Sequence, residues 1–183
     1  MDTPNNWNTY GLRWDMYDWM QYCYSPGLTP ITNNVYISDW DSSLDTSLLE
    51  KHNIKTILCV NERAKPAYML DKYISNDIVH YQLQAEDMPT EDLARFFRWS
   101  YDFINNSRDR GNVLVHCTAG ISRSATIVTH YLLWKAKQEI PTTTLSEVLE
   151  FMKKRRPCIN PNPSFMKQLH AAEKKMDTSL SKK

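Results

Sequence analysis

The chain has 183 residues, enough for one domain with a sizeable core, and 42% of them are hydrophobic and 23% charged, as in ordinary globular proteins. The net charge of +1 creates no overall field that would draw the protein to nucleic acid or to an anionic membrane. No run of about 18 apolar residues is present, and residues 1–10 lack the basic region and apolar core of a secretory signal. We therefore expect no membrane association and no secretion.

Four cysteines are spread along the sequence, without a CxxC pair and without clustering near histidines. They are Cys23, Cys59, Cys117 and Cys158. Zinc sites need closely spaced ligands, so we expect no metal and no cofactor. Dispersed free thiols are typical of a reducing compartment, which places the protein in the cytoplasm or the nucleus.

Short runs rich in Val, Ile and Tyr predict strands at residues 35–38, 55–60, 78–84 and 113–117. Apolar residues at helical spacing predict helices at residues 45–53, 90–108, 122–137, 143–156 and about 162–175. Asp45 is the expected N-cap of the first helix, and Thr90 is the expected start of the second, followed by acidic residues in its first turn.

Strands separated by helices predict an α/β fold with a mostly parallel sheet, of about five strands, and helices on both faces. The most continuously apolar strand segment, residues 113–115, belongs near the centre of that sheet. The loop that follows it then lies at the carboxyl edge of the sheet, where α/β proteins bind their ligands.

An aromatic-rich segment at residues 14–26 stands apart from this pattern. Its apolar residues at helical spacing are Met16, Trp19, Met20 and Cys23. Such a stripe most often covers the core of its own domain. The alternative is a homodimer or partner contact through residues 14–24.

The stretch 113-VLVHCTAGISRSATIV-128 joins the central strand to a helix through a compact loop. Backbone N–H groups in such a loop, together with the N-terminus of the helix, form an anion-binding nest. Gly120 permits the positive φ that this turn needs. Arg123, six residues after Cys117, adds a planar guanidinium that matches two phosphate oxygens. The loop therefore predicts a site for a tetrahedral dianion.

Cys117 lies at the base of this predicted site. Nearby cations and helix N-termini lower the pKa of a cysteine thiol from near 8.5 to roughly 3.5–7.5, so we expect a thiolate nucleophile. Ser124 is either a simple helix cap or a donor that helps the thiolate leave. His116 is either a satisfied polar residue or a support that hydrogen-bonds the loop.

Phosphoryl transfer also needs an acid to protonate the leaving oxygen, and the same group can later activate water. The loop 84-QAEDMPTEDL-93 follows a predicted strand and precedes a helix. Asp87 is the preferred acid because it lies in the loop proper. The alternatives are Glu86, Glu91 and Asp92, of which the last two are expected in the first turn of the helix.

The residues 116-HCTAGISRS-124 resemble the HCxxGxxRS motif of the cysteine-dependent protein tyrosine phosphatases, and the form AGISRSAT resembles the dual-specificity phosphatases. The DxP pattern of that family's general-acid loop resembles 87-DMP-89. The segment 156-RPCINPNPSFMKQL-169 resembles the family's RPxxxPNxxFxxQL pattern, which implies that Asn162 braces the active-site loop. The resemblance covers about residues 30–175.

The resemblance implies a catalytic-domain-only dual-specificity phosphatase that acts through a cysteinyl-phosphate, with a phosphoprotein as its partner. It divides the chain into an N-terminal extension at 1–29, the catalytic domain at 30–175 and a flexible tail at 176–183. The implied phosphate loop contains Cys117, Thr118, Ala119, Gly120, Ile121, Ser122 and Arg123. Its uncharged inner residues favour phosphoproteins over phosphoinositides. Two alternatives are a phosphoprotein-binding domain with little turnover and a phosphatase of a lipid, carbohydrate or RNA 5′-phosphate.

The basic run 153-KKRR-156 has two interpretations. Nuclear import or contact with nucleic acid is one of them. We favour the other, a solvated helix end, because cations are stabilised at helix C-termini.

Overall fold

The computed structural model describes residues 27–180, so the predicted helix at 14–26 lies outside the described residues. The described chain forms one five-stranded sheet in the order β1-β2-β5-β3-β4. The strands are β1 (Thr29–Pro30), β2 (Val35–Ser38), β3 (Ile54–Val60), β4 (Val79–Leu83) and β5 (Asn112–His116). All neighbouring strands are parallel except β1 and β2. The predicted α/β fold is confirmed.

Strand β5 is the central strand of the sheet, and both of its faces are covered. Val113, Leu114 and Val115 are fully buried. Val115 is in register with Ile37 of β2 on one side and with Leu58 of β3 on the other. A strand without polar residues in its middle fits only such a position, as the sequence predicts.

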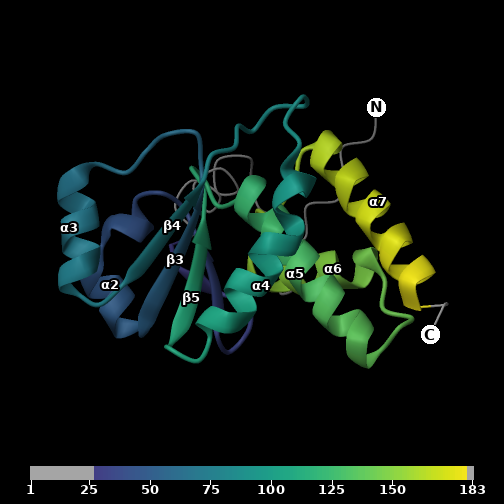
Figure 1. Ribbon diagram of the computed structural model, residues 1–183, viewed down its shortest axis with the longest axis horizontal. Coiled ribbons are helices and arrows are strands. Elements are labelled where there is room, and N and C mark those ends of the chain that lie inside the picture. Colours follow the sequence, from purple (N-terminus) through teal and green to yellow (C-terminus); the bar gives the residue numbers. More distant parts are fainter. Residues whose placement is uncertain (1–26, 181–183) are drawn as a thin grey trace, which may run out of the picture.

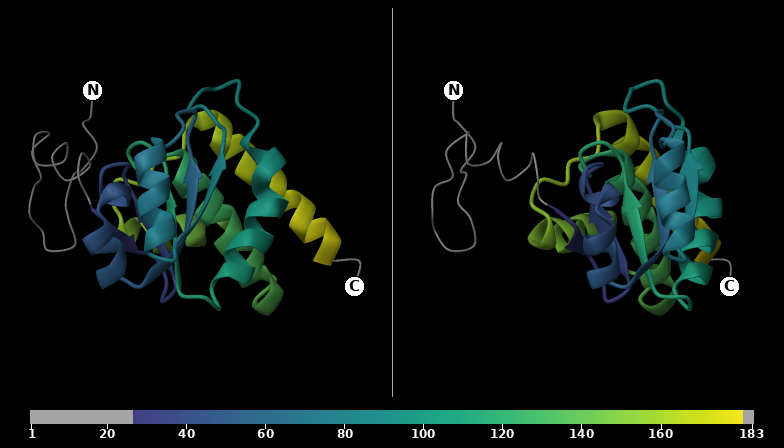
Figure 2. Two further views of the ribbon diagram at one scale, coloured as in Figure 1. Left: turned by 60° about the vertical axis from the view of Figure 1, so that its left-hand side comes forward. Right: turned by 90° about the vertical axis from the view of Figure 1, so that its left-hand side faces the viewer.

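Helices cover both faces of the sheet (Figure 1). One face carries α2 (Thr46–Lys51) and α3 (Ala67–Ser75). On the other face lie α4 (Phe97–Ser107), α5 (Arg123–Glu139), α6 (Leu145–Arg155) and α7 (Pro163–Leu180), which Figure 2 shows from two further directions. Two 3-10 turns complete the fold, η1 (Ser42–Leu44) and η2 (Leu93–Phe96). None of the helices in this described region is both long and apolar enough to cross a membrane.

Local sequence signals explain two of the helix starts. The carboxylate of Asp45 accepts a hydrogen bond from the backbone N–H of Leu48, which makes Asp45 the N-cap of α2 as expected. Thr144 and Glu147 form a reciprocal capping box at the start of α6. This capping box marks the point after α5 at which the chain enters α6.

The predicted helix at 90–108 begins later than expected. Thr90 does not cap it, because the chain first makes the 3-10 turn η2 and α4 starts only at Phe97. Glu91 and Asp92 accordingly precede the helix, and no acidic residue lies in the first turn of either η2 or α4.

The predicted flexible tail also begins too early in the sequence. Helix α7 continues to Leu180, and Met176 is buried in the main core. Asp177 accepts a hydrogen bond from the ammonium of Lys137 on α5, at 2.6 Å. Burial thus holds Met176 to the domain, and an ion pair holds Asp177.

Candidate active site

The loop between β5 and α5 folds back over the carboxyl end of the sheet. Gly120 adopts a φ of 68°, the left-handed region, and a Cβ there would lie 2.5 Å from the carbonyl oxygen of Ser38. Only glycine is accommodated without a shift of the backbone. This turn directs the backbone N–H of Gly120 toward the sulfur of Cys117, at 3.3 Å.

The thiol of Cys117 lies at the base of the loop and is nearly inaccessible, with 2% of the residue exposed. Besides the N–H of Gly120, the hydroxyl of Ser124 lies within hydrogen-bonding distance of its Sγ, at 3.3 Å. Ser124 belongs to the first turn of α5, so the positive end of the helix also faces the sulfur. The sulfur is therefore surrounded by hydrogen-bond donors from the loop and from the first turn of α5.

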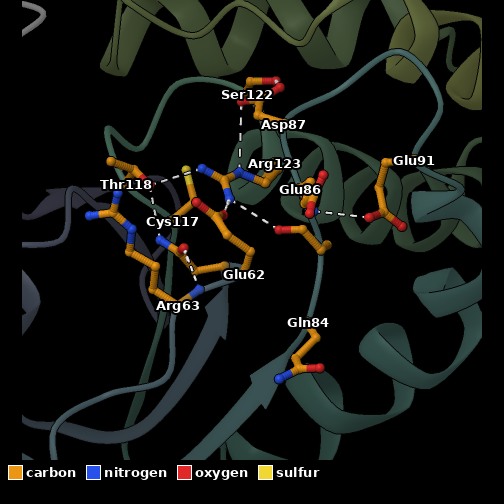
Figure 3. Close-up of polar contacts among 12 residues, drawn as sticks. Glu62, Arg63, Gln84, Glu86, Asp87, Glu91, Cys117, Thr118, Ser122 and Arg123 are labelled. Carbon is orange, nitrogen blue, oxygen red and sulfur yellow. Dashed lines mark hydrogen bonds and ion pairs between the residues drawn. The ribbon is translucent and has the colours of Figure 1, made fainter.

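The guanidinium of Arg123 is buried beside the sulfur and is held by several partners (Figure 3). It donates to the hydroxyl of Thr118 at 2.9 Å and to the carbonyl of Ala85 at 3.0 Å, and it forms an ion pair with Glu62. Its Nε has no hydrogen-bond partner and lies 3.7 Å from a carboxylate oxygen of Asp87. The Nε edge of the guanidinium therefore faces the carboxylate of Asp87.

Asp87 reaches the site from the loop after β4, on the opposite side from the sheet. One of its carboxylate oxygens accepts hydrogen bonds from Ser122 Oγ and from Asn162 Nδ2, both at 2.8 Å. Asn162 also donates its backbone N–H to Ser122 Oγ at 3.2 Å. Three segments that are distant in sequence therefore meet at one carboxylate.

The other acidic residues of the Asp87 loop are arranged differently. The backbone N–H of Glu86 donates to the carboxylate of Glu91 at 2.9 Å, and Glu91 also pairs with Arg95 at 3.0 Å. In Figure 3, Glu91 lies on the far side of Glu86 from Cys117. Within residues 27–180, neither Glu86 nor Glu91 forms a hydrogen bond or ion pair with the cysteine loop, in contrast to Asp87.

His116 lies directly under the loop and is fully buried. Burial is the first cause that holds its pKa well below the usual value, and the charge of Lys65 acts in the same direction. Its Nδ1 lies 3.1 Å from the carbonyl oxygen of Cys117. A neutral imidazole that donates from Nδ1 fits this geometry and fixes the start of the loop.

Two residues directly after β3 also contact the site and were not predicted from the sequence. Asn61 donates from its side chain to Thr118 Oγ1 at 2.9 Å, and Glu62 pairs with Arg123. Partial burial raises the pKa of Glu62, but backbone hydrogen bonding and the charge of Arg123 outweigh it, so the pKa is below the usual value. Both residues directly follow a predicted strand, at the same sheet edge as Cys117, and this position is the feature of the sequence that could have indicated a role in the site.

The comparisons with known proteins agree with this geometry. Residues 35–175 match the family model described as dual specificity phosphatase, catalytic domain. The chain belongs to this family. Dual specificity protein phosphatase 22 of Homo sapiens is 33% identical to it over 149 residues, which cover 81% of this chain and 74% of that protein. Dual specificity protein phosphatase 22-B of Danio rerio is 33% identical over 144 residues, 78% of this chain and 72% of that protein.

Two solved phosphatase structures have the same architecture as this chain. The crystal structure of DUSP15 has a TM-score of 0.70 and 30% identity, and the match covers 86% of this chain and 96% of that one. A mouse putative dual specificity phosphatase, crystallised with zinc tungstate, has a TM-score of 0.73 over 85% of this chain and 91% of that one. At 24% identity, the second likeness concerns the fold alone.

Arg156 corrects the interpretation of the basic run as a solvated helix end. Its three neighbours, residues 153–155, are exposed, but Arg156 itself is fully buried. Its guanidinium donates to the carbonyl oxygens of Gly120 at 2.9 Å and Ala119 at 3.2 Å, and to Thr29 Oγ1 at 2.8 Å. Carbonyls that point outward toward Arg156 leave the N–H side of the phosphatase loop facing the sulfur.

Replacing Arg156 with Met is expected to lower the free energy of unfolding by about 3 kcal/mol or more, because buried carbonyls lose charged donors. Inorganic phosphate should also inhibit the variant more weakly, since the loop loses its support. Urea denaturation and phosphate inhibition measure the two effects. The exposed neighbour gives a matched control, and Arg155→Met should change stability by no more than about 0.5 kcal/mol. Equal effects of the two substitutions would contradict this role.

Proposed function

We propose that this phosphatase hydrolyses phosphotyrosine and phosphoserine/phosphothreonine in proteins through a covalent cysteinyl-phosphate at Cys117. One observation carries the proposal: a buried sulfur, an adjacent guanidinium and a carboxylate on a separate loop converge at the carboxyl end of β5. Nucleophile, charge stabiliser and proton donor are the parts that phosphoryl transfer requires.

In the first step the Cys117 thiolate attacks phosphorus, an S–P bond forms, and the P–O bond to the substrate oxygen breaks. Loop N–H groups and Arg123 stabilise the negative charge on the three equatorial oxygens. Asp87 gives its proton to the leaving oxygen, which departs as the alcohol or phenol. The reaction requires no metal and no cofactor.

In the second step water attacks phosphorus, Asp87 takes a proton from that water, and the S–P bond breaks. The thiolate returns as the leaving group. The hydroxyl of Ser124, 3.3 Å from Sγ, stabilises the negative charge that forms on sulfur. Inorganic phosphate is released and the enzyme is restored with Asp87 protonated.

Substrate class follows from the lining of the loop. Thr118, Ala119, Ile121 and Ser122 are uncharged, so the loop offers no cations for the additional phosphates of a phosphoinositide. Phosphoproteins are therefore the proposed substrates, and residues 30–175 are the proposed catalytic domain. Cys59 and Cys117 are free thiols, which supports a reducing compartment such as the cytoplasm or the nucleus.

A substrate panel tests this proposal. Initial rates are measured on matched phosphotyrosine and phosphothreonine peptides, a phosphoinositide and a 5′-phosphorylated RNA, in the presence of a metal chelator. We expect turnover of both peptide classes and much slower release of phosphate from the lipid and the RNA. Binding of phosphopeptide without turnover would instead identify a phosphoprotein-binding domain. Faster turnover of lipid or RNA would reassign the substrate.

A further inference from the structure

A surface hollow of about 600 Å³ lies away from the phosphatase loop. Its walls come from the turn at residues 30–34, from Arg108 after α4, from Leu132 and Lys135 on α5, and from Arg155 at the end of α6. Helices α5 and α6 lie next to each other in the fold (Figure 1). The hollow therefore joins the edge of the sheet to two helices that continue from the active-site region.

The charges of this hollow have one sign. Arg108, Lys135 and Arg155 contribute three cations, and no carboxylate is among the lining residues in the described part of the chain. The partners of the two arginines are neutral: Arg108 donates to the hydroxyl of Tyr131 at 3.3 Å, and Arg155 donates to the carbonyl of Phe151 at 3.1 Å. The structure records no ion pair for any of the three cations within residues 27–180.

The cations also influence one another. The pKa of Lys135 is below its usual value, because of partial burial first and of the charge of Arg108 second, while Glu139 one turn further along α5 acts in the opposite direction. Clustered like charges are costly to the free protein, and an anionic ligand that enters the hollow relieves this cost.

Apolar groups accompany the three cations. Leu132 is half-buried, Phe151 is 38% exposed, and Pro30 is exposed at the rim. The guanidinium of Arg155 stacks on the ring of Phe151, 3.6 Å from its centre. A small polyanion such as an inositol phosphate would leave this apolar surface in water. A peptide with an apolar side chain between carboxylates would contact both kinds of group.

We propose that the hollow is a docking site for an acidic segment of the phosphoprotein substrate, in which an apolar side chain packs near Leu132 and carboxylates pair with Arg108, Lys135 and Arg155. This inference rests on the proposed function. Leu132 is nine residues beyond Arg123 on α5, about 14 Å along the helix axis. A fully extended peptide covers that distance in about four or five residues, so the segment lies at least about five residues from the phosphorylated residue.

The test uses the full chain and two double variants. Lys135→Glu/Arg155→Glu reverses two cations of the hollow. Lys153→Glu/Lys154→Glu makes the same change of net charge at two exposed positions of α6 that do not line it. The probes are a phosphotyrosine peptide with the segment Asp-Glu-Leu-Asp-Glu five residues away, and the same peptide with Asn and Gln in place of the acids. Each peptide is also made fluorescent and unphosphorylated for binding by anisotropy.

We expect the wild-type chain to bind the acidic peptide about tenfold more tightly than the neutral one, and to show the same preference in kcat/KM. Lys135→Glu/Arg155→Glu, the hollow variant, should lose this preference, whereas Lys153→Glu/Lys154→Glu, the control variant, should keep most of it. Hydrolysis of p-nitrophenyl phosphate, which is too small to reach the hollow, should be the same in all three proteins. Binding of the unphosphorylated peptides does not depend on turnover, so docking is tested separately from the proposed chemistry.

Two results would overturn the docking proposal. One is an equal affinity of the wild-type chain for the acidic and neutral peptides. The other is an equal loss in the two double variants, which would mean that only net charge matters. A third arm measures inositol hexakisphosphate. Suppose that inositol hexakisphosphate binds the wild-type chain but not Lys135→Glu/Arg155→Glu, while the acidic peptide binds no more tightly than the neutral one. The hollow then takes a small polyanion, and the peptide proposal is wrong.

Discussion

Replacing Cys117 with Ser should lower kcat for p-nitrophenyl phosphate by about 10⁴-fold or more. Serine is similar in size, so the loop keeps its shape, but its hydroxyl is not ionised at neutral pH and is a far weaker nucleophile. Binding of phosphopeptide should persist, because the N–H groups and Arg123 are untouched. Steady-state kinetics with a coloured aryl phosphate, together with phosphopeptide binding, measure both expectations.

Cys59 provides the matched control for this substitution. It is buried at the end of β3, and burial raises the pKa of its thiol to about 12, so it is not a nucleophile at neutral pH. Cys59→Ser should retain most of the wild-type kcat even if it lowers stability. Wild-type turnover in the Cys117→Ser protein would rule out the covalent mechanism, and a comparable loss in Cys59→Ser would show that the defect is not specific to the loop.

Asp87→Asn should slow the hydrolysis of a poor leaving group, such as an alkyl phosphate, by about 10²–10⁴-fold. The reason is that a poor leaving group needs a proton in the transition state and Asn has no acidic proton to give. A good leaving group such as p-nitrophenolate departs without one, so its first step should change little. The measurement compares kcat/KM for a series of phosphate esters whose leaving groups differ in pKa.

Glu86→Gln is the control for Asp87→Asn because Glu86 is the neighbouring carboxylate of the same loop and lacks contacts with Ser122 and Asn162. It should leave the dependence of kcat/KM on the leaving group unchanged. Equal losses for good and poor leaving groups in Asp87→Asn would mean that Asp87 is not the acid. A steeper dependence in Glu86→Gln would transfer the role to Glu86.

Much of the fold was predictable because its signals are local. The uninterrupted apolar run at residues 113–115 predicts a strand that is buried on both faces, and this is the central strand β5. Asp45 specifies the start of α2 through its own hydrogen bond. The 3-10 turn η2 was not predictable, because its apolar residues also fit the first turn of an α-helix. Helix α3 was missed: it has only nine residues, and two of its apolar residues, Tyr68 and Ile74, are exposed, whereas Met69 and Tyr73 are buried.

The site, like the fold, has residues that could be predicted from a local motif and others that could not. Cys117 and Arg123 lie in one short stretch, whose residue types and spacing indicate phosphate chemistry without any structure. The partners that hold them come from elsewhere in the sequence: Glu62 lies just after β3, and Arg156 lies just after α6. Arg156 follows three exposed basic residues, and its burial depends on how α6 meets the loop. A sequence pattern of cations does not report such tertiary contacts.

The most direct test of the covalent mechanism is to trap the intermediate itself. A phosphopeptide is mixed with the wild-type chain and with the Cys117→Ser protein, the reactions are stopped with acid within milliseconds, and the digested proteins are examined by mass spectrometry. We predict one phosphate on the wild-type peptide that contains Cys117, which disappears as substrate is exhausted, and none in the variant. Release of phosphate without any phosphorylated Cys117, or phosphate attached to another residue, would contradict the mechanism.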